Sequence, residues 1–456
     1  MIDTELKFLE NDIAEVINLF VDKDSVNLRH RFTESENKIV NTITVNGRVF
    51  AYGNLITLPN DEIVRKRLIK RYAKLSAYKA LSKVFEKEMP WGALTGIRPT
   101  KLAYLELEER GSFSDFFTDT MKVSKEKTEL VEKIIETQKG IYKKDDNNTD
   151  FFVFIPFCPS RCKYCSFITS DIKRNEQYVD AYVDTLIREI EESKDYIKNL
   201  RSIYIGGGTP VALDDRNLDK VLTAIDKINK GVEYTVEAGR PDRITESNLK
   251  ILKDHGVTRI CINPQTFNDN TLQLLGRNHK ASEIEKKYAL AKGSFDINMD
   301  LIAGLPGETI SDFKYSLDKA VALSPEDITV HTLCIKKSSY LAMEESRLNG
   351  DSVSEMVDYS YKTLAKNGYM PYYMYRQKYM AGNLENVGYC KEGKACVYNV
   401  NVMEEISSTV ACGANAISKK VFNSENRIER LASPKDVKTY LEKIDTILSN
   451  KKNFFN

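Results

Sequence analysis

The sequence predicts an α/β protein: a partial (β/α)6 barrel with an additional N-terminal α+β domain and a C-terminal α/β extension. Three observations predict this class. In the middle of the chain, short apolar runs alternate with helical patterns, which is typical of parallel strands joined by helices. Glycines and polar residues follow these runs at one end, where such barrels place their chemistry. Finally, the 456 residues are 42% hydrophobic and 29% charged, which is a globular composition.

The N-terminal domain is expected over residues 1–148, where it would contact the substrate or a partner. A β-hairpin is predicted over residues 38–57, because alternating apolar positions flank Asn46-Gly47, a dipeptide typical of tight hairpin turns. The polar stretch 143–150 (KKDDNNTD) indicates a linker. We therefore place the domain boundary in this stretch.

A long helix is predicted over residues 62–87, with Asp61 as its N-terminal cap. The helix carries a basic cluster: Arg65, Lys66, Arg67, Lys70, Arg71 and Lys74. Such a cluster is typical of a solvated helix face, and a face that binds RNA or a protein partner is the alternative.

The barrel is expected over residues 149–340, and an extension that closes the active site over residues 341–456. Strands are predicted at 151–156, 202–205, 233–237, 258–263, 296–302 and 327–333. Helices are predicted between them, near 175–198, 214–228, 245–255, 281–293 and 310–322. Six strand–helix units favour an open or incomplete barrel.

Unusual residues follow five successive predicted strands, at the edge where their carboxyl ends would meet. They are Cys158, the run Gly206–Pro210, Glu237, Gln265 and Asp300, the last followed by a Gly-Leu-Pro-Gly turn. The packing of a core does not predict polar and glycine residues at each of these ends. Their common position therefore indicates an active site.

Three cysteines lie within eight residues after the first of these strands: Cys158, Cys162 and Cys165. Grouped thiols on a loop indicate a metal site, and thiolates suit zinc or an iron–sulfur cluster. A structural zinc site normally has four ligands. The other five cysteines are dispersed: Cys261, Cys334, Cys390, Cys396 and Cys412. The pattern favours a four-iron cluster with one open iron, and zinc or free thiols are the alternatives.

This spacing resembles the C-x3-C-x2-C motif of the radical S-adenosylmethionine (SAM) enzymes. The resemblance implies a [4Fe–4S] cluster held by Cys158, Cys162 and Cys165, with SAM bound to the open iron through its amino and carboxylate groups. An electron from a low-potential donor of the flavodoxin or ferredoxin type would then cleave SAM and give a 5′-deoxyadenosyl radical. The protein would bind and orient these groups and exclude side reactions.

The sequence is more closely similar to the oxygen-independent coproporphyrinogen III oxidase-like family. Five stretches carry this similarity: Ile155–Cys158 (IPFC), Gly206–Pro210 (GGGTP), Pro264–Phe267 (PQTF), Leu275–His279 (LGRNH) and Met299–Gly307 (MDLIAGLPG). Three more resemble its HemZ-type branch: Trp91–Lys101 (WGALTGIRPTK), Tyr375–Lys378 (YRQK) and Gly382–Gly388 (GNLENVG). That branch also carries an extra N-terminal domain.

The cofactor contacts that this resemblance implies fall on matching positions of the chain. Gly207, Gly208 and Thr209 would approach the amino group of SAM, where glycine leaves room for a ligand. The other implied contacts, to one SAM or two, are Tyr164 inside the cysteine motif, Glu237 on SAM, Gln265 on the nucleoside or a second SAM, Arg277 on a carboxylate, Asp300 on a ribose or methionyl group, and Ile302 beside the adenine.

A porphyrinogen substrate carries propionates, which need cationic partners beside a wide apolar pocket. The expected partners are Arg98, Lys101, Arg376 and Lys378. Nearby aromatic residues would flank a flat macrocycle, or form a strand packed on the barrel: Tyr372, Tyr373, Tyr375 and Tyr379. His279 and His331 are candidate haem ligands, with structural histidines as the alternative.

Some positions depart from the family pattern. Phe152 and Phe167 stand where the oxidase has a tyrosine and a further cysteine, and a phenyl ring supplies neither a hydrogen-bond donor nor an acceptor. Both changes count against full oxidative decarboxylation. Cys412 and Asn415 lie in a glycine-rich segment where small residues are typical, and Cys412 is interpreted as a small core residue.

The resemblance implies a redox enzyme of anaerobic haem biosynthesis. It would convert two propionates of coproporphyrinogen III to vinyl groups and give protoporphyrinogen IX. Three alternatives stay open: a haem-binding carrier of the same lineage, a radical SAM enzyme that methylates or opens haem, and an RNA-modifying radical enzyme.

The charge balance and the chain's hydropathy predict where such a protein would work. A net charge of +1 gives no general reason to expect nucleic acid as a partner. No apolar run approaches the roughly 20 residues that span a bilayer, and the first residues lack a signal-peptide pattern. We therefore expect a cytoplasmic protein without a membrane span.

Overall fold

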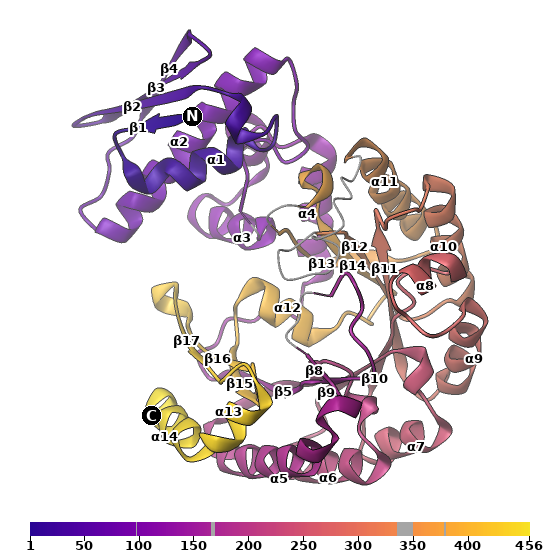
Figure 1. Ribbon diagram of the computed structural model, residues 1–456. Helices are drawn as coiled ribbons and strands as arrows, with labels where there is room; N and C mark the ends of the chain where they lie inside the picture. Colours follow the sequence, from indigo (N-terminus) through magenta and orange to yellow (C-terminus); the bar gives the residue numbers. More distant parts are fainter. Residues whose placement is uncertain (97, 166–168, 335–349, 378–379) are drawn as a thin grey trace. The chain divides into compact units, whose positions relative to one another are not determined.

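The computed structural model describes residues 1–96, 98–165, 169–334, 350–377 and 380–456 (Figure 1). The chain forms two compact units. The first comprises residues 1–132 and 382–384, and the second residues 133–381 and 385–456. The predicted domain limits at 148/149 and 340/341 stay predictions, and the second of them lies outside the described residues.

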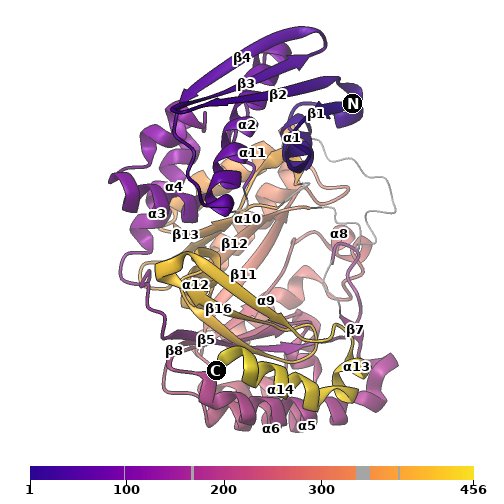
Figure 2. The ribbon, with the colours of Figure 1, turned by 90° about the vertical axis from the view of Figure 1, so that its left-hand side faces the viewer.

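The first unit is a four-stranded sheet with helices α1 and α2 packed against it (Figure 2). In the strand order β1-β2-β3-β4, β1 is parallel to β2 and the other pairs are antiparallel. The elements are β1 (Ile2–Thr4), α1 (Glu10–Ile17), β2 (Leu28–Ser35), β3 (Lys38–Val45), β4 (Arg48–Leu55), α2 (Glu62–Phe85), α3 (Pro99–Arg110) and α4 (Lys125–Thr137), the last of which runs into the second unit.

The predicted hairpin and helix cap are both confirmed in this unit. β3 and β4 are joined by Asn46-Gly47, which adopt φ values of 47° and 86°. Two consecutive residues with positive φ suit the right-handed twist of a two-residue hairpin. At the start of α2, Asp61 Oδ1 accepts a hydrogen bond from the backbone N–H of Val64 (2.8 Å).

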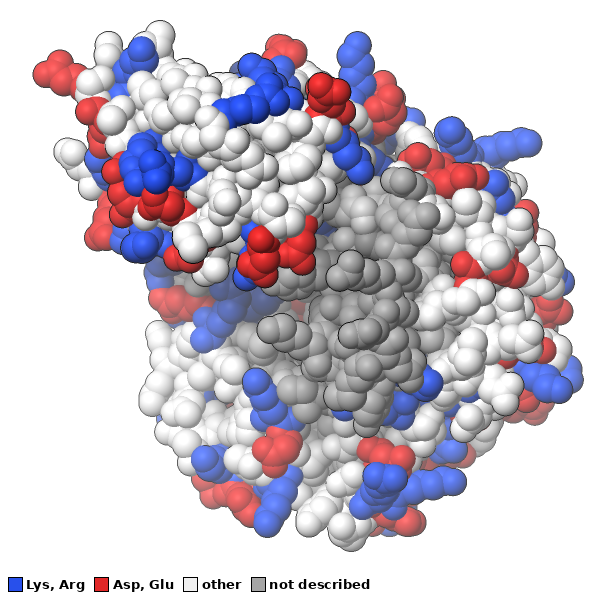
Figure 3. Space-filling model, turned by 45° about the horizontal axis from the view of Figure 1, so that its top comes forward, with Lys and Arg blue, Asp and Glu red and all other residues white. Residues whose placement is uncertain are grey.

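The basic cluster of α2 is largely engaged in ion pairs within the first unit. Lys70 Nζ lies 2.9 Å from the carboxylate of Asp12, and Lys74 Nζ lies 3.6 Å from the same group. Arg71 contacts the buried carboxylate of Glu106 (3.3 Å). Positive and negative side chains also alternate over the face seen in Figure 3. These contacts favour a solvated, ion-paired helix face over one that binds RNA.

The second unit is built on one large sheet, which has 11 strands among the described residues in the order β13-β14-β12-β11-β10-β9-β8-β5-β15-β16-β17. Six neighbouring strands in its centre are mutually parallel. They are β5 (Asn148–Ile155), β8 (Asn199–Gly207), β9 (Glu233–Gly239), β10 (Arg259–Ile262), β11 (Asp296–Ala303) and β12 (Asp327–Thr332). Each coincides with a predicted strand.

Helices connect these strands and cover the outer face of the curved sheet (Figure 1). They are α5 (Glu176–Ser193), α6 (Asp215–Asp226), α7 (Glu246–Asp254), α9 (Ala281–Ala291) and α10 (Ile310–Leu323), with a short additional helix α8 (Asp269–Leu274) before α9. In α6 the buried side chains include Leu218, Val221, Leu222 and Ile225, which have the spacing expected of an amphipathic helix. The predicted strand–helix repeat is therefore confirmed.

The C-terminal region adds strands to both edges of the central sheet. On one side β13 (Met370–Tyr375) and β14 (Asn386–Cys390) continue from β12, and on the other β15 (Ser408–Cys412) pairs with β5 and is followed by β16 (Ile417–Phe422) and β17 (Arg427–Ala432). The helices of this region are α11 (Gly350–Lys366), α12 (Val397–Glu404), α13 (Val437–Glu442) and α14 (Ile444–Phe455). Because β13 and β17 are the edges of the described sheet, the barrel stays open, as predicted.

The last helix is attached through a buried ion pair. Lys451 of α14, 2% exposed, donates hydrogen bonds to Glu189 Oε1 of α5 (2.6 Å) and to the carbonyl of Ala411 in β15 (2.9 Å). Cys412 Sγ lies 3.4 Å from the same ammonium and is 0% exposed, so its interpretation as a core residue is confirmed. None of the described helices has the length and apolar character required to cross a membrane.

Candidate active site

A pocket of about 580 Å³ lies inside the curve of the central sheet in the second unit. All of the residues predicted to bind the cluster or SAM line it: Cys158, Cys162, Tyr164, Cys165, Gly207, Gly208, Thr209, Glu237, Gln265, Arg277, Asp300 and Ile302. They come from the ends of five parallel strands and from the segments that follow these strands. The tertiary structure thus gathers at one place residues that are spread over 145 positions of the chain, from 158 to 302.

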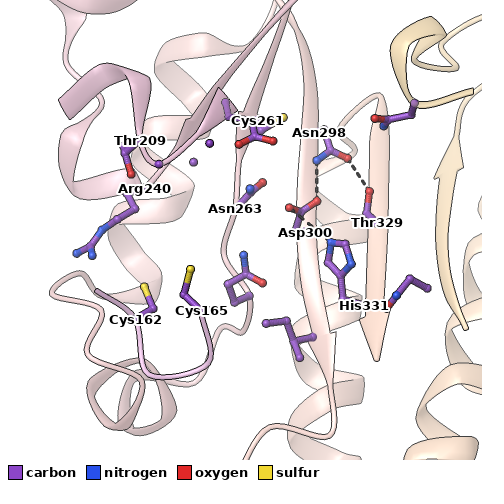
Figure 4. Close-up of a pocket in the computed structure, with 18 of the residues that line it drawn as sticks. Cys162, Cys165, Thr209, Arg240, Cys261, Asn263, Asn298, Asp300, Thr329 and His331 are labelled. Atoms are coloured by element: carbon purple, nitrogen blue, oxygen red, sulfur yellow. Dashed lines mark hydrogen bonds and ion pairs between the residues drawn. The ribbon is translucent and has the colours of Figure 1, made fainter. Parts of the chain in front are cut away.

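The cysteine loop, residues 158–165, begins in the short strand β6 (Phe157–Cys158), which pairs with β7 (Ser170–Asp171). Cys162 and Cys165 direct their sulfur atoms into the pocket (Figure 4). The backbone N–H of Cys165 donates to the carbonyl of Cys162 (3.0 Å), and Thr209 Oγ1 donates to Cys158 Sγ (3.6 Å). Burial raises the pKa of the Cys158 thiol, so binding of iron would have to favour its thiolate.

The loop is also tied to the segment that follows β10. The backbone N–H of Lys163 donates to the carbonyl of Leu275 (3.1 Å). Arg277 Nη1 donates to the hydroxyl of Tyr164 (2.8 Å), and Arg277 Nη2 donates to the carbonyl of Asn263 (2.7 Å). Arg277 therefore holds the cysteine loop, and its predicted contact with a carboxylate of SAM stays a prediction.

The glycine run after β8 packs closely against the first strand. Gly207 has a φ of +103°, which favours glycine, and a Cβ at Gly208 would lie 2.5 Å from the carbonyl oxygen of Phe157. The backbone N–H of Gly208 donates to Ile155 O (2.7 Å), and that of Thr209 donates to Phe157 O (2.8 Å). The structure thus adds a second reason for glycine here, because a side chain at 208 would collide with β6 itself.

Glu237, near the end of β9, projects into the pocket beside this glycine run. Its Oε1 accepts a hydrogen bond from the hydroxyl of Tyr204 on β8 (2.6 Å). Burial raises the pKa of Glu237 to about 7, although the Tyr204 hydroxyl opposes the shift. Two aromatic rings pack against the ring of Tyr204. The centroid of the Phe152 ring lies 6.2 Å from that of Tyr204, and the ring of Tyr398 from α12 stacks on Tyr204 with 4.3 Å between the centroids.

Gln265 is held in a strained conformation after β10. Its φ is +68°, a value that non-glycine residues adopt at an energetic cost. Two backbone hydrogen bonds hold it there, from its own N–H to Asp300 O (2.8 Å) and from the N–H of Ile302 to its carbonyl (3.0 Å). Its buried Oε1 has no hydrogen-bond partner among the described residues. A strained polar residue with a free acceptor on the pocket is typical of a ligand-binding position.

The pocket wall opposite the cysteine loop is a chain of polar side chains on β11, β12 and β13 (Figure 4). Asn298 Nδ2 donates to Asp300 Oδ1 (2.8 Å), and Thr329 Oγ1 donates to Asn298 Oδ1 (3.1 Å). His331 Nε2 lies 3.7 Å from Asp300 Oδ2, and its Nδ1 lies 3.3 Å from the hydroxyl of Tyr375. Asp300 and His331 are thus oriented before any ligand arrives.

The two candidate haem-ligating histidines lie in different surroundings. The imidazole of His331 is 26% exposed and lines the pocket, whereas that of His279 is 0% exposed and lies 3.7 Å from Asp242. The contacts of His279 favour the structural alternative. Those of His331 leave it available to a ligand in the pocket.

The residues predicted to contact the substrate, unlike those predicted to bind the cofactors, are not found together around the pocket. Arg376 is 3% exposed and is absent from the pocket lining, which takes its neighbours Tyr375 and Gln377. Arg98 and Lys101 belong to the first unit, at the start of α3. Lys378, like Phe167 and Tyr379, lies outside the described residues. The propionate-binding role of these four basic residues stays a prediction.

The tyrosines of β13 agree with both interpretations of the sequence, since they pack in the core and also face the pocket. Tyr372 and Tyr373 are buried in β13 and pack against Cys390 and Cys396, as a strand packed on the barrel would. The same two residues and Tyr375 also line the pocket. These side chains thus form an aromatic wall that is part of the core.

Sequence reasoning missed several residues that shape the pocket. Arg240, Tyr204, Asn263 and Asn298 all line it. Arg240 and Asn263 follow strands β9 and β10, a position that by itself could have marked them. Tyr204 and Asn298 lie within strands, and their sequence carries no signal that they face inward.

Comparison with known proteins now identifies the family. Residues 152–320 match the model of the radical SAM superfamily. Over 375 residues the chain is 36% identical to the oxygen-independent coproporphyrinogen-III oxidase-like protein HemZ of Bacillus subtilis (strain 168), covering 78% of this chain and 75% of that protein. The chain belongs to the oxygen-independent coproporphyrinogen-III oxidase-like family of radical SAM proteins.

The chain is also similar to proteins named as haem chaperones. The haem chaperone HemW of Lactococcus lactis is 34% identical over 235 residues, which cover 49% of this chain and 60% of that protein. The haem chaperone HemW of Haemophilus influenzae is 30% identical over 302 residues, or 64% of this chain and 75% of that protein. The fold is similar to that of the coproporphyrinogen III oxidase HemN of Escherichia coli, with a TM-score of 0.53 at 20% identity over 68% of this chain and 71% of that one.

Membership of the radical SAM superfamily implies a [4Fe–4S] cluster and SAM as cofactors, and the residues of the pocket fit both. Among the described residues, no group of three His, Cys, Asp or Glu converges as the ligands of a single ion do. Thiolates that bind different irons of one cluster need not converge in this way. The free acceptors Gln265 Oε1 and Asn263 Oδ1 suit the amino and hydroxyl donors of SAM.

Proposed function

We propose that this radical SAM protein is an oxidoreductase of anaerobic haem biosynthesis, which converts coproporphyrinogen III to protoporphyrinogen IX. One observation carries the proposal: the predicted cofactor residues surround a single pocket, whose opposite wall is built from tyrosines and from Asp300 and His331, which lie 3.7 Å apart. Two named proteins support the substrate class, the coproporphyrinogen-III oxidase-like relative and the oxidase that shares the fold.

The reaction removes one carboxyl group at a time. When bound, the cluster and SAM supply a 5′-deoxyadenosyl radical, produced with an electron from a flavodoxin- or ferredoxin-type donor. A hydrogen atom leaves the β-carbon of a propionate and ends on 5′-deoxyadenosine. The substrate radical then loses carbon dioxide and passes one electron to an external acceptor, which leaves a vinyl group.

The protein side chains would orient the substrate and keep the radical on its path. Tyr373 and Tyr375 would lie along the macrocycle, and Asp300 with His331 would hold polar groups at the reacting edge. Closing the pocket to water would protect the radical from side reactions. The N-terminal unit is proposed to contact the substrate or a partner, with Arg98 and Lys101 as its candidate propionate partners.

The test is anaerobic turnover of coproporphyrinogen III by reconstituted protein, with SAM and a low-potential reductant, followed by mass spectrometry. We expect 5′-deoxyadenosine, and a porphyrinogen that has lost two carbon dioxide molecules and four hydrogen atoms. The Cys162→Ala variant should form neither product. Protein that carries its cluster and cleaves SAM but leaves coproporphyrinogen unchanged would overturn the proposal.

A second candidate, a haem chaperone, is favoured by the HemW relatives and by His331. A half-buried imidazole on the pocket wall is a suitable axial ligand for haem iron. This candidate predicts stoichiometric haem binding whose visible spectrum changes in His331→Ala, without decarboxylation. A gain of a methyl group, or an opened ring, on added haem would instead indicate a haem-modifying radical enzyme.

A further inference from the structure

The cysteine loop has two spacers between its cysteines, and a buried arginine holds each of them. In the second spacer, Tyr164 accepts a hydrogen bond from Arg277, as described above. In the first spacer, Ser160 Oγ accepts a hydrogen bond from Arg240 Nη1 (2.6 Å), and the carbonyl oxygen of Ser160 lies 3.4 Å from the same nitrogen. Nothing in the family resemblance assigned a role to Arg240.

Asp242 fixes the orientation of the Arg240 guanidinium. Nε donates to Asp242 Oδ1 (2.9 Å) and Nη2 donates to Oδ2 (3.0 Å), a planar two-point contact that Lys cannot make. Burial alone would raise the pKa of Asp242, but the two hydrogen bonds from Arg240 and the nearby imidazole of His279 hold that pKa well below its usual range. Asp242 is therefore a carboxylate at neutral pH, and Nη1 of Arg240 is left to face the loop.

Arg240 also lies in the pocket that contains the three cysteines of the loop. It directly follows β9, and its side chain is 6% exposed while it lines the pocket with the three cysteines. Figure 4 shows it on the same side of the pocket as Cys162 and Thr209, and its charge acts on the thiol of Cys158. A guanidinium in this place is a buried positive charge next to the site of an anionic cluster.

We propose that Arg240 is a positioning residue for the [4Fe–4S] cluster. Held by Asp242, it fixes the first spacer of the cysteine loop through Ser160 and places a fixed positive charge beside the cluster. The first effect pre-orders three thiols that iron must find together, as residues outside a metal's ligand set commonly do. The second stabilises the reduced cluster, which carries one more negative charge than the oxidised one.

Two substitutions separate the geometric effect from the charge effect. Arg240→Lys keeps the positive charge but cannot hold Asp242 and Ser160 together. Arg240→Gln removes the charge as well. Arg243→Lys is the matched control, because Arg243 lies three residues away on the same turn, donates to Ala212 O (3.3 Å) and does not line the pocket.

The measurements are iron and sulfide content after anaerobic reconstitution, the rate of iron loss to a chelator, and the midpoint potential by EPR-monitored titration. We expect both Arg240 variants to lose iron about 10- to 100-fold faster than the wild type. The potential of Arg240→Gln should be more negative than that of Arg240→Lys. Arg243→Lys should match the wild type in every readout.

Ser160→Ala supplies an independent check, because it removes the hydroxyl, the nearer of the loop's two acceptors, and leaves Arg240 in place. Ser160→Ala should also lose iron faster than the wild type. The double variant with Arg240→Gln should lose iron little faster than either single variant, because both substitutions break the hydrogen bond between Arg240 and Ser160. Far-UV circular dichroism and thermal unfolding of the apoproteins show whether each variant folds. Wild-type iron retention in both Arg240 variants, or fully additive effects, would overturn the proposal, as would a wild-type protein that takes up no iron. None of these readouts depends on the substrate.

Discussion

Two glutamates of the second unit differ in whether a buried cation is paired with them. Glu189 on α5 is 0% exposed, and its two oxygens accept from Lys451 Nζ (2.6 Å), Tyr440 OH (2.6 Å) and Gly413 N (2.7 Å). Glu237 on β9 faces the pocket, where its Oε1 accepts from the hydroxyl of Tyr204. The carboxylate of Glu189 is therefore paired with a buried cation, whereas that of Glu237 accepts a hydrogen bond from the neutral hydroxyl of a tyrosine.

The difference shows how this chain separates stability from binding. A buried carboxylate without a cation favours its neutral form, which is why burial raises the pKa of Glu237 to about 7. A ligand that brings an ammonium group would place a positive charge beside this carboxylate. Glu189 has no such capacity left, because the protein already occupies both of its oxygens. The four predictions below test this contrast.

The largest effect is expected from Lys451→Met. Removing the ammonium leaves Glu189 as an uncompensated buried charge, which costs about 3–5 kcal/mol of the free energy of unfolding. The measurement is urea unfolding of the apoprotein at pH 8.

The neighbouring Lys452 is exposed, so Lys452→Met is the matched control and should unfold as the wild type does. If the two variants were equally stable, Glu189 would not depend on its cation, and the contrast with Glu237 would be lost.

Glu237→Gln should increase the free energy of unfolding, in contrast to Lys451→Met, and the increase should depend on pH. The pKa of Glu237 is raised from 4.5 to about 7, so between these values the folded state holds a proton that the unfolded state has released. Native stability therefore falls as the pH rises through this window, by up to about 3 kcal/mol. Glutamine has no proton to release, so the variant should be more stable than the wild type at pH 8 and similar to it at pH 4.

The measurement is the difference in free energy of unfolding between variant and wild type across this pH range. Glu246→Gln, at an exposed position in the first turn of α7, serves as the control. A difference that does not change with pH would show that Glu237 ionises normally. The same Glu237 variant should bind SAM more weakly at pH 8, if the carboxylate is the group that SAM contacts.

Tyr204→Phe should weaken SAM binding about tenfold at neutral pH. The lost hydroxyl oriented the Glu237 carboxylate and lowered its pKa, so the pKa of Glu237 should rise further and less of the carboxylate should be ionised. Calorimetric titration of SAM into reconstituted protein measures the change. Tyr196→Phe, whose ring stacks on Phe455 away from the pocket, should leave the affinity unchanged. An unchanged affinity in Tyr204→Phe would place SAM away from Glu237.

The smallest effect is expected from Cys412→Ala. The thiol is one of several groups around Lys451, which keeps Glu189, Ser193 and Ala411 as partners. We expect a loss of about 1 kcal/mol in the free energy of unfolding and no change in iron content. Cys162→Ala should behave in the reverse way, with little change in the stability of the apoprotein and loss of the cluster. Iron loss in Cys412→Ala would contradict its interpretation as a core residue.

Much of the fold was predictable because it depends on local patterns. The six parallel strands, their helices, the Asn46-Gly47 turn and the Asp61 cap each have a signal within about ten residues of sequence. The cysteine motif is equally local, since its three thiols share one loop. The glycine and polar residues at strand ends followed from the rule that parallel strands present their carboxyl ends at one edge.

The contacts between distant residues were not predictable in the same way. Arg277 donates to Tyr164, 113 positions earlier in the chain, and no local pattern indicated this contact. Its predicted contact with a carboxylate of SAM stays a prediction. Arg376 carries the charge expected of a propionate partner, but this residue directly follows β13 and is absent from the pocket lining. The inward direction of Tyr204 depends on the register of β8 against β5, and a shift of one residue would reverse it.

The amino-acid sequence by itself determined the class of fold, the three cluster thiols and the set of strand ends around which the chemistry gathers, because period, turn residues and spacing act over short distances. Only the tertiary structure decided which side chains complete one another: Lys451 with Glu189, Tyr204 with Glu237, and Arg240 with Ser160. These pairs join elements far apart in the chain, and the free energy of a buried polar group depends on the partner that folding brings to it.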